Sequence, residues 1–229
     1  MLLTIRQAAE LIEVPERTVE GWVKREGLPA TRVRGELRLN RVDLLEWATE
    51  HRIKVSPRLF AEDEGPGSQM PTLLSALRAG GVHYGVTGED AFSVLTSVVS
   101  FLPLPPDMDP EFLLQILMAR EALGTTAVGD GIAIPHVRNP ILLTLVAPTV
   151  LLCFLERPVD FKAVDEKPVD TLFTLLTPTV NIHLHLLSRL AYLIREEPFK
   201  ELLRHRAPPE TIFAAVEEME TRLEAKRKP

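Results

Sequence analysis

The chain has 229 residues and a formal net charge of −6, and its 45% hydrophobic content is enough for a packed core, which excludes disorder throughout. The single cysteine, Cys153, excludes an intramolecular disulfide, and no apolar run reaches the roughly 18 residues that a membrane span requires. Residues 1–10 lack the basic and apolar regions of a secretory leader, so we expect a cytoplasmic protein with no membrane insertion.

The charge is unevenly distributed along the chain. Residues 1–60 hold 11 Lys+Arg against 9 Asp+Glu, a net of +2, whereas residues 61–229 hold 15 against 23, a net of −8. Between the two parts, the stretch AEDEGPGSQMP is acidic and carries Pro and Gly, as is typical of an exposed linker. We therefore predict a domain at residues 1–55, a linker at 56–70 and a second domain at 71–225.

Before the linker, the pattern predicts three helices and a hairpin. Thr4 and Pro15 lie where an N-cap and a helix start are expected. Ahead of the third helix the residues alternate and turn at Arg34-Gly35-Glu36, which indicates a hairpin. In chain order, the predicted elements are helices over residues 5–12 and 16–27, the hairpin over 28–40 and a helix over 41–51.

After the linker, helical patterns and apolar strands alternate. The helical patterns fall on residues 72–80, 89–102, 111–124, 182–196 and 208–225. The strand-like segments are residues 131–136, 141–155 and 169–178. This alternation favours an α/β domain with a largely buried sheet.

The most informative segment is REALGTTAVGDGIAIPHVRNP, residues 120–140. A helix leads into a loop of small and hydroxyl-bearing residues, 125–131, and then into a short strand over residues 132–134. Pro135 cannot donate to a ladder, so regular pairing should stop there and leave His136 at the strand end, where it can be exposed.

A neutral imidazole is a nucleophile that can carry a phosphoryl group. Such a group brings roughly two negative charges, which need hydrogen-bond donors and a cation. The segment supplies Arg120, the hydroxyls of Thr125 and Thr126, and backbone N–H groups that glycines leave accessible. A second imidazole can serve as a hydrogen-bond partner, and His183 and His185 are the candidates.

These residues resemble the phosphorylation signature of the fructose/mannitol-type enzyme IIA domains of the bacterial phosphotransferase system, including the nitrogen-regulatory branch. That signature is an Arg-Glu at a helix end, a Gly/Thr-rich loop and Gly-x-Ala-x-Pro-His, which stand here as Arg120-Glu121, residues 123–126 and residues 131–136. Residues 158–178 and 183–191 resemble two later family segments in the right order. The resemblance covers about residues 70–223 and implies a mixed-sheet α/β/α sandwich of the enzyme IIA type.

The resemblance implies a role for each matching residue. His136 accepts a phosphoryl group from a histidine phosphocarrier protein, His183 lies beside it, and Arg120 supplies positive charge. The predicted phosphate-binding residues are Thr125, Thr126 and Gly131, and no cofactor is implied. His183 is preferred to His185 because it begins the family's His-Leu-x-x-Leu pattern, and two residues of separation on a helix point to different faces. Val137 departs from the Gly that many members carry there, which bears on the access of partner proteins.

Plainer interpretations of the same residues stay open. His136 can be a core histidine with satisfied nitrogens, His183 a local capping residue, and Arg120 one half of a surface ion pair. A metal site is not expected, because the histidines lack a tight ligand pattern such as His-Glu-x-x-His.

The first domain resembles the excisionase/MerR-type winged helix-turn-helix family over about residues 2–50. The pattern is Leu-Thr-x-x-x-Ala-Ala, then Val-x-x-Trp, Gly-Leu-Pro and Arg. In that family the second helix enters the major groove and the wing contacts the backbone. The family positions are matched on the helix and around the wing, so DNA is a predicted partner. They are Glu16, Arg17, Thr18, Lys24 and Arg25 on the helix, and Arg32, Arg34 and Arg38 around the wing. Glu16 and Glu20 dilute the positive face, and a protein-interaction module is the alternative.

Three functions follow from these two resemblances. The first is a regulatory phosphocarrier whose state at His136 is coupled to DNA binding and transcription, with a homodimer expected. The second is a transport component that passes the phosphoryl group to a sugar-specific IIB partner. The third is an interaction protein that is never phosphorylated.

Overall fold

The computed structural model describes residues 2–33, 35–51, 53, 70–106, 108–137 and 147–227. The chain divides into two compact units, Met1–Ser68 and Gln69–Pro229. Apart from Met70, the predicted linker at residues 56–70 lies outside the described residues, so its boundaries remain a prediction.

The first unit is a three-stranded antiparallel sheet with three helices. Its central strand pairs with both of the others, in the order β1-β3-β2. The elements are β1 (Leu2–Thr4), α1 (Ile5–Leu11), α2 (Glu16–Arg25), β2 (Thr31–Val33), β3 (Glu36–Asn40) and α3 (Arg41–Glu50). The predicted winged helix-turn-helix arrangement is confirmed, whereas β1 was not predicted, because three residues are too few to show a period.

Local chemistry explains why these helices start and pack as they do. The Thr4 hydroxyl accepts from the Gln7 N–H at 3.1 Å, and the Gln7 side chain accepts from the Thr4 N–H at 2.9 Å, which is a capping box. Trp47 of α3 packs its ring 4.9 Å from that of Trp22 of α2, between centroids, and donates its indole N–H to the Glu26 carbonyl. The second helix is thereby held against the third.

The second unit is built on a five-stranded mixed sheet in the order β4-β7-β8-β6-β5. The strands are β4 (Val82–Val86), β5 (Ala127–Gly129), β6 (Ile132–Ala133), β7 (Thr149–Val159) and β8 (Val169–Leu176). β4 is parallel to β7 and β6 to β8, while the β7–β8 and β5–β6 pairs are antiparallel. Residues 149–155 of β7 and most of β8 are buried on both faces, as in a sheet that is covered on both sides.

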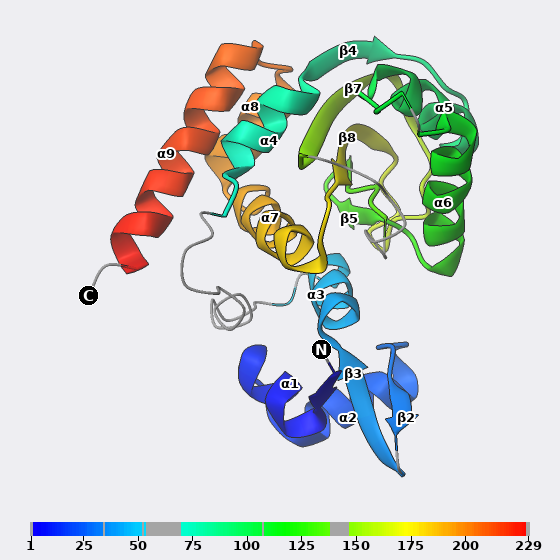
Figure 1. The fold of residues 1–229 in the computed structure, drawn as a ribbon, viewed down its shortest axis with the longest axis vertical. Helices are drawn as coiled ribbons and strands as arrows, with labels where there is room; N and C mark the ends of the chain where they lie inside the picture. Colours follow the sequence, from blue (N-terminus) through cyan, green and yellow to red (C-terminus); the bar gives the residue numbers. More distant parts are fainter. Residues whose placement is uncertain are drawn as a thin grey trace. The chain divides into compact units, whose positions relative to one another are not determined.

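Helices cover both faces of this sheet. They are α4 (Leu73–Gly80), α5 (Ala91–Phe101), α6 (Pro110–Leu123), α7 (Val180–Leu193), α8 (Glu197–Arg204) and α9 (Pro209–Arg227). Figure 1 shows α5 and α6 on one side of the strands, and α4, α7 and α9 on the other. The predicted mixed-sheet α/β/α sandwich is confirmed.

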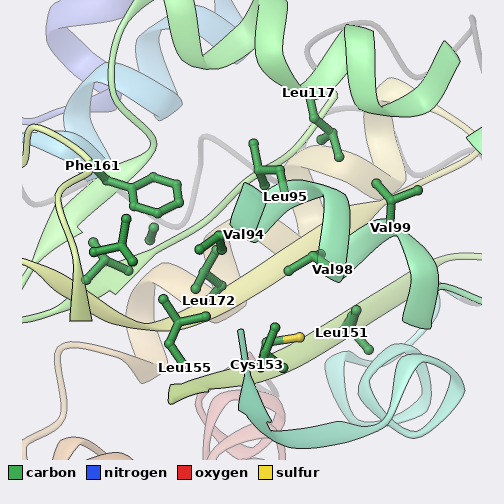
Figure 2. Close-up of a cluster of buried hydrophobic side chains, with 14 of the residues drawn as sticks. Val94, Leu95, Val98, Val99, Leu117, Leu151, Cys153, Leu155, Phe161 and Leu172 are labelled. Carbon is green, nitrogen blue, oxygen red and sulfur yellow. The ribbon is translucent and has the colours of Figure 1, made fainter. Parts of the chain in front are cut away.

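The core between the sheet and the α5–α6 layer is a continuous apolar cluster (Figure 2). Leu151 and Cys153 of β7 and Leu172 of β8 point toward Leu95 of α5 and Leu117 of α6. Residues 172, 174 and 176 of β8 therefore face α5 and α6, because side chains alternate along a strand.

Three elements of the second unit escaped prediction. In β4, the consecutive residues Tyr84 and Gly85 are both exposed, which breaks the alternation expected of a strand. β5 is a three-residue strand that was predicted to be loop. α8 follows α7 after a short turn and was not predicted, since the helix predicted over residues 182–196 ends before α8 begins. Of the strand-like segment predicted over residues 141–155, residues 141–146 lie outside the described part, and β7 continues to Val159.

Among the described residues, no helix is long and apolar enough to cross a membrane.

Candidate functional site

His136 lies where β6 leaves regular pairing. Beyond Ala133 the ladder is interrupted, and His136 forms a single parallel bridge with Leu175 of β8. Pro135 has no N–H to give, but its carbonyl accepts from the Leu175 N–H at 2.9 Å. The expectation that this strand end exposes His136 is wrong. The residue is only 3% exposed, because side chains from α6 and α7 lie against the ring.

Each nitrogen of the His136 ring has a different kind of partner. Nδ1 lies 2.7 Å from the Ile134 carbonyl oxygen, and Nε2 lies 3.2 Å from Nε of Arg120. A carbonyl can only accept and a guanidinium can only donate. The hydrogen-bond network therefore assigns the proton to Nδ1 and leaves the lone pair on Nε2.

Arg120 reaches the histidine from the last turn of α6 and is 9% exposed. Its Nη1 donates to the Gly124 carbonyl at 2.9 Å, which fixes the guanidinium across the helix end. This places a permanent positive charge beside Nε2, at the position where an anionic group attached to that nitrogen would lie.

His183 comes from the first turn of α7, which Thr179 caps by accepting from the Ile182 N–H at 3.3 Å. Its ring centroid is 5.3 Å from that of His136, with the planes at 45°. The N-terminal turn of a helix carries partial positive charge, so α7 adds to the attraction for an anion. His185 is also buried on α7, two residues further on.

The structure places the three predicted phosphate-binding residues in different settings. Thr125 donates its hydroxyl to the Phe161 carbonyl, and Thr126 donates its hydroxyl to a Glu121 carboxylate oxygen at 2.6 Å. Both residues lie beside the end of β6, because the Ile134 N–H donates to the Thr126 carbonyl.

Gly131 is not brought to His136. It lies in the turn between β5 and β6, with a φ of 77°, next to Asp130 with a φ of 54°. Its carbonyl accepts from the N–H groups of Asp170 and Thr171 at the start of β8. Five residues of extended chain, about 16 Å, separate it from the histidine. The loop predicted over residues 125–131 is thus largely a hairpin, and its glycines serve the turn.

Sequence reasoning gave no role to Glu121, which entered only as part of the motif, and did not select Thr177. The Glu121 carboxylate accepts from both the N–H and the hydroxyl of Thr126, and so fixes the chain beside Pro135. Thr177 follows β8, is 2% exposed, and has no hydrogen-bond partner for its hydroxyl. A polar residue in the apolar run LFTLLTP was the available signal.

Among the described residues, no group of three or more His, Cys, Asp or Glu side chains could hold a metal ion.

In the first unit, most of the predicted DNA-binding positions lie on the outward side of α2. Arg17, Lys24 and Arg25 are exposed and Thr18 is half-buried, while Val19 on the opposite side is fully buried. Gly21 lies among the three cations. A Cβ there would meet only the Arg25 guanidinium, at 3.4 Å, so the described part of the domain does not itself require glycine.

In the wing, Arg32 of β2 is exposed, whereas Arg38 of β3 is paired. Arg38 of β3 donates to the Glu36 carboxylate at 2.7 Å, so part of its charge is neutralised. Arg34 lies outside the described residues.

Comparison with known families agrees with both units. A family model described as "Phosphoenolpyruvate-dependent sugar phosphotransferase system, EIIA 2" matches residues 86–219. A second model, described as "Helix-turn-helix domain", matches residues 2–52.

Similar individual proteins match the second unit. A "Nitrogen regulatory protein" from Pseudomonas aeruginosa is 38% identical over 113 residues, which cover 48% of this chain and 71% of that protein. A protein of the same name from Bradyrhizobium diazoefficiens is 39% identical over 106 residues, with 45% and 67% covered. Among solved structures, the nitrogen regulatory protein IIA-Ntr from Neisseria meningitidis superposes with a TM-score of 0.53 at 28% identity, covering 62% of this chain and 94% of that one.

Proposed function

Because this chain belongs to the EIIA 2 family of the phosphoenolpyruvate-dependent sugar phosphotransferase system, we propose that His136 accepts a phosphoryl group from a histidine phosphocarrier protein, and that the N-terminal helix-turn-helix domain couples this state to DNA binding. The observation that carries the proposal is the pair of hydrogen bonds on the His136 ring. They leave Nε2 as an unprotonated nucleophile beside a buried arginine.

The transfer needs no proton to be removed from His136. The Nε2 lone pair attacks phosphorus, the bond between phosphorus and the donor histidine breaks, and its electron pair returns to the donor nitrogen. Nδ1 keeps its proton on the Ile134 carbonyl, so the phosphorylated ring is an imidazolium. A cationic ring leaves as neutral imidazole, which suits onward transfer to another acceptor.

Arg120 supports this step in two ways. Before transfer, its Nε–H donates to the Nε2 lone pair and so orients the ring. During transfer, that lone pair is consumed, and the donor turns to the phosphoryl oxygens, where charge-assisted bonds are stronger. The first turn of α7 adds its partial positive charge, and the His183 ring lies beside that of His136.

A regulatory role is favoured by the presence of the helix-turn-helix unit on the same chain. The outward face of α2 presents three cations around Gly21, and glycine in a helix interior costs about 1 kcal/mol relative to alanine. Because Gly21 has no Cβ, another molecule can approach the helix backbone closely at this position, which offsets the lower helix propensity of glycine. Duplex DNA, with its phosphates, suits both the charge and the closeness.

The test is intact mass spectrometry of the full chain after incubation with phosphoenolpyruvate and the upstream relay proteins. We expect a gain of one phosphoryl group that is lost on acid treatment, and no gain in His136→Ala. His205→Ala is the matched control, since the His205 side chain is 77% exposed at the end of α8, and it should be labelled as the wild type is. Undiminished labelling of His136→Ala would contradict the assignment.

The transport alternative predicts a different fate for the same group. If the chain is a transport component, its phosphoryl group should pass rapidly to a sugar-specific IIB protein. A regulator should instead retain the group in the presence of such proteins and change its DNA affinity upon phosphorylation. Measuring the rate of transfer to a IIB protein and the DNA affinity of the same phosphorylated preparation separates the two functions.

A further inference from the structure

Two threonines of the second unit keep buried hydroxyls that have no hydrogen-bond partner. Thr174 of β8 is 0% exposed and Thr177, just beyond that strand, is 2% exposed. A buried hydroxyl without a partner costs about 1–3 kcal/mol relative to an apolar group of the same shape, and valine has that shape. An unsatisfied buried hydroxyl in a native structure therefore calls for an explanation at each of the two positions.

The register of the sheet puts these two threonines on opposite faces. Leu172 and Leu176 belong to the core beneath α5 and α6, so Thr174 faces that layer. Phe173 instead packs against Phe199 of α8, with ring centroids 6.4 Å apart, so positions 173 and 175 face the α7–α8 layer. Alternation continued for one step beyond β8 places Thr177 on this second face.

The second face is also the one on which the histidines meet. His136 bridges to Leu175, two residues before Thr177, and its ring contacts that of His183 on α7. Thr177 lies on the short connection between β8 and α7, since β8 ends at Leu176 and Thr179 caps α7. Its hydroxyl is therefore buried at the C-terminal end of the strand pair that carries His136.

The Thr177 hydroxyl differs from those of Thr125 and Thr126 in having no hydrogen-bond acceptor. A hydroxyl has one proton to donate. Thr125 gives its proton to the Phe161 carbonyl, and Thr126 gives its proton to the Glu121 carboxylate. The proton of Thr177 has no acceptor in the described structure of the unphosphorylated chain.

We propose that the Thr177 hydroxyl binds the phosphoryl group carried by His136, donating to one of its oxygens. The inference rests on the proposed function of His136 and adds a residue to it. A phosphoryl group brings about three acceptor oxygens, which supply the missing partner only when the chain is phosphorylated. In the unphosphorylated chain the unsatisfied Thr177 hydroxyl lowers stability, and in the phosphorylated chain the same hydroxyl binds the anion.

The experiment compares Thr177→Val with Thr174→Val and Thr177→Ser in the full chain. The probe is phosphoenolpyruvate with the upstream relay proteins, and the readouts are the initial rate of phosphorylation and the hydrolysis rate of the isolated phosphoprotein. For Thr177→Val we expect phosphorylation to be about tenfold slower and hydrolysis faster, from the loss of one charge-assisted bond. Thr174→Val and Thr177→Ser should match the wild type in both readouts.

Thermal unfolding of the unphosphorylated proteins supplies the readout that separates binding from damage. Both valine variants should unfold at the same temperature as the wild type or higher, because each removes an unsatisfied hydroxyl. Wild-type rates in Thr177→Val, or an equal loss of rate in Thr174→Val, would overturn the inference while leaving the role of His136 intact. A wild-type chain that accepts no phosphoryl group would instead refute the proposed function and the inference with it.

Discussion

The chemistry of His136 is decided by two partners that differ greatly in sequence distance. The Ile134 carbonyl is two residues away on the same strand end, so local geometry alone sets the protonation of Nδ1. Arg120 is sixteen residues away on α6, and it reaches Nε2 only because the β5–β6 hairpin folds back beside the helix end. Tautomer and charge are thus supplied independently, so a change at one need not disturb the other.

Cys153 offers a residue-scale prediction with a simple readout. It is fully buried in β7, and this burial raises the pKa of its thiol to about 12. The thiolate is the reactive form, so at pH 8 the folded protein should react with a thiol reagent far more slowly than a free cysteine does. Unfolding in guanidinium returns the pKa to its ordinary range, and labelling should then reach one group per chain.

This measurement also reports on folding, because Cys153 is the one cysteine of the sequence and lies in the second unit. The ratio of labelling rates in the folded and unfolded protein gives the free energy of the opening that exposes it. Rapid labelling of the folded chain at pH 8 would show that the β7 core is open in solution.

At the scale of elements, one buried carboxylate joins three helices. Glu220 of α9 is 5% exposed and accepts from the backbone N–H groups of Leu73 and Leu74 at 2.7 and 3.1 Å. It also pairs with Arg189 of α7 at 3.0 Å. The first turn of α4 is capped in this way by a side chain from a helix almost 150 residues later, which adds to the local cap from Thr72.

Glu220→Ala should therefore be costly. It leaves the partly buried Arg189 charge without this acceptor and two helix N–H groups without this partner, so we expect the free energy of unfolding to fall by about 3 kcal/mol. Glu217→Ala, an exposed position on α9, is the matched control and should change stability by less than about 0.5 kcal/mol.

Urea unfolding followed by far-UV circular dichroism measures this difference. Tryptophan fluorescence would not serve, because Trp22 and Trp47 both lie in the first unit. Equal stabilities for the two glutamate variants would contradict the role of Glu220.

At the scale of the whole molecule, charge is unevenly distributed: residues 1–60 carry a net of +2 and residues 61–229 a net of −8. In the first unit, Arg17 and Lys24 lie seven residues apart on one face of α2. A protein that neutralises phosphates binds duplex DNA with an affinity that falls steeply with salt.

This predicts the behaviour of a double variant. Arg17→Gln with Lys24→Gln should weaken binding to a non-cognate duplex and reduce the slope of log affinity against log salt by about 2, one for each lost phosphate contact. Arg157→Gln with Lys162→Gln, both exposed in the second unit, removes the same charge and should leave the slope unchanged. Fluorescence anisotropy between 50 and 200 mM salt, a range of about fourfold, resolves this difference. Binding by the wild type that does not depend on salt would contradict a DNA-binding role.

Sequence patterns predicted a large part of this architecture, and the reasons differ among elements. Helices such as α6 and α9 carry long periods and clear ends, so their limits were predicted to within a few residues. β5 was predicted to be loop, because Ala127–Gly129 are small residues whose pairing with β6 is a tertiary fact. The choice of His136, His183 and Arg120 came from a motif, and the structure brings these three side chains together.

What the sequence by itself determined is the order of elements and the residue types available for chemistry, since periodicity, caps and motifs are local. Only the tertiary structure decided the surroundings of His136. It buries a ring that was expected at the surface, assigns its proton through a carbonyl and an arginine, and engages the hydroxyls of Thr125 and Thr126 elsewhere. It leaves the Thr177 hydroxyl without a partner on the same face of the sheet, which no local pattern could reveal. The physical reason is that hydrogen-bond satisfaction and burial depend on which distant segments meet.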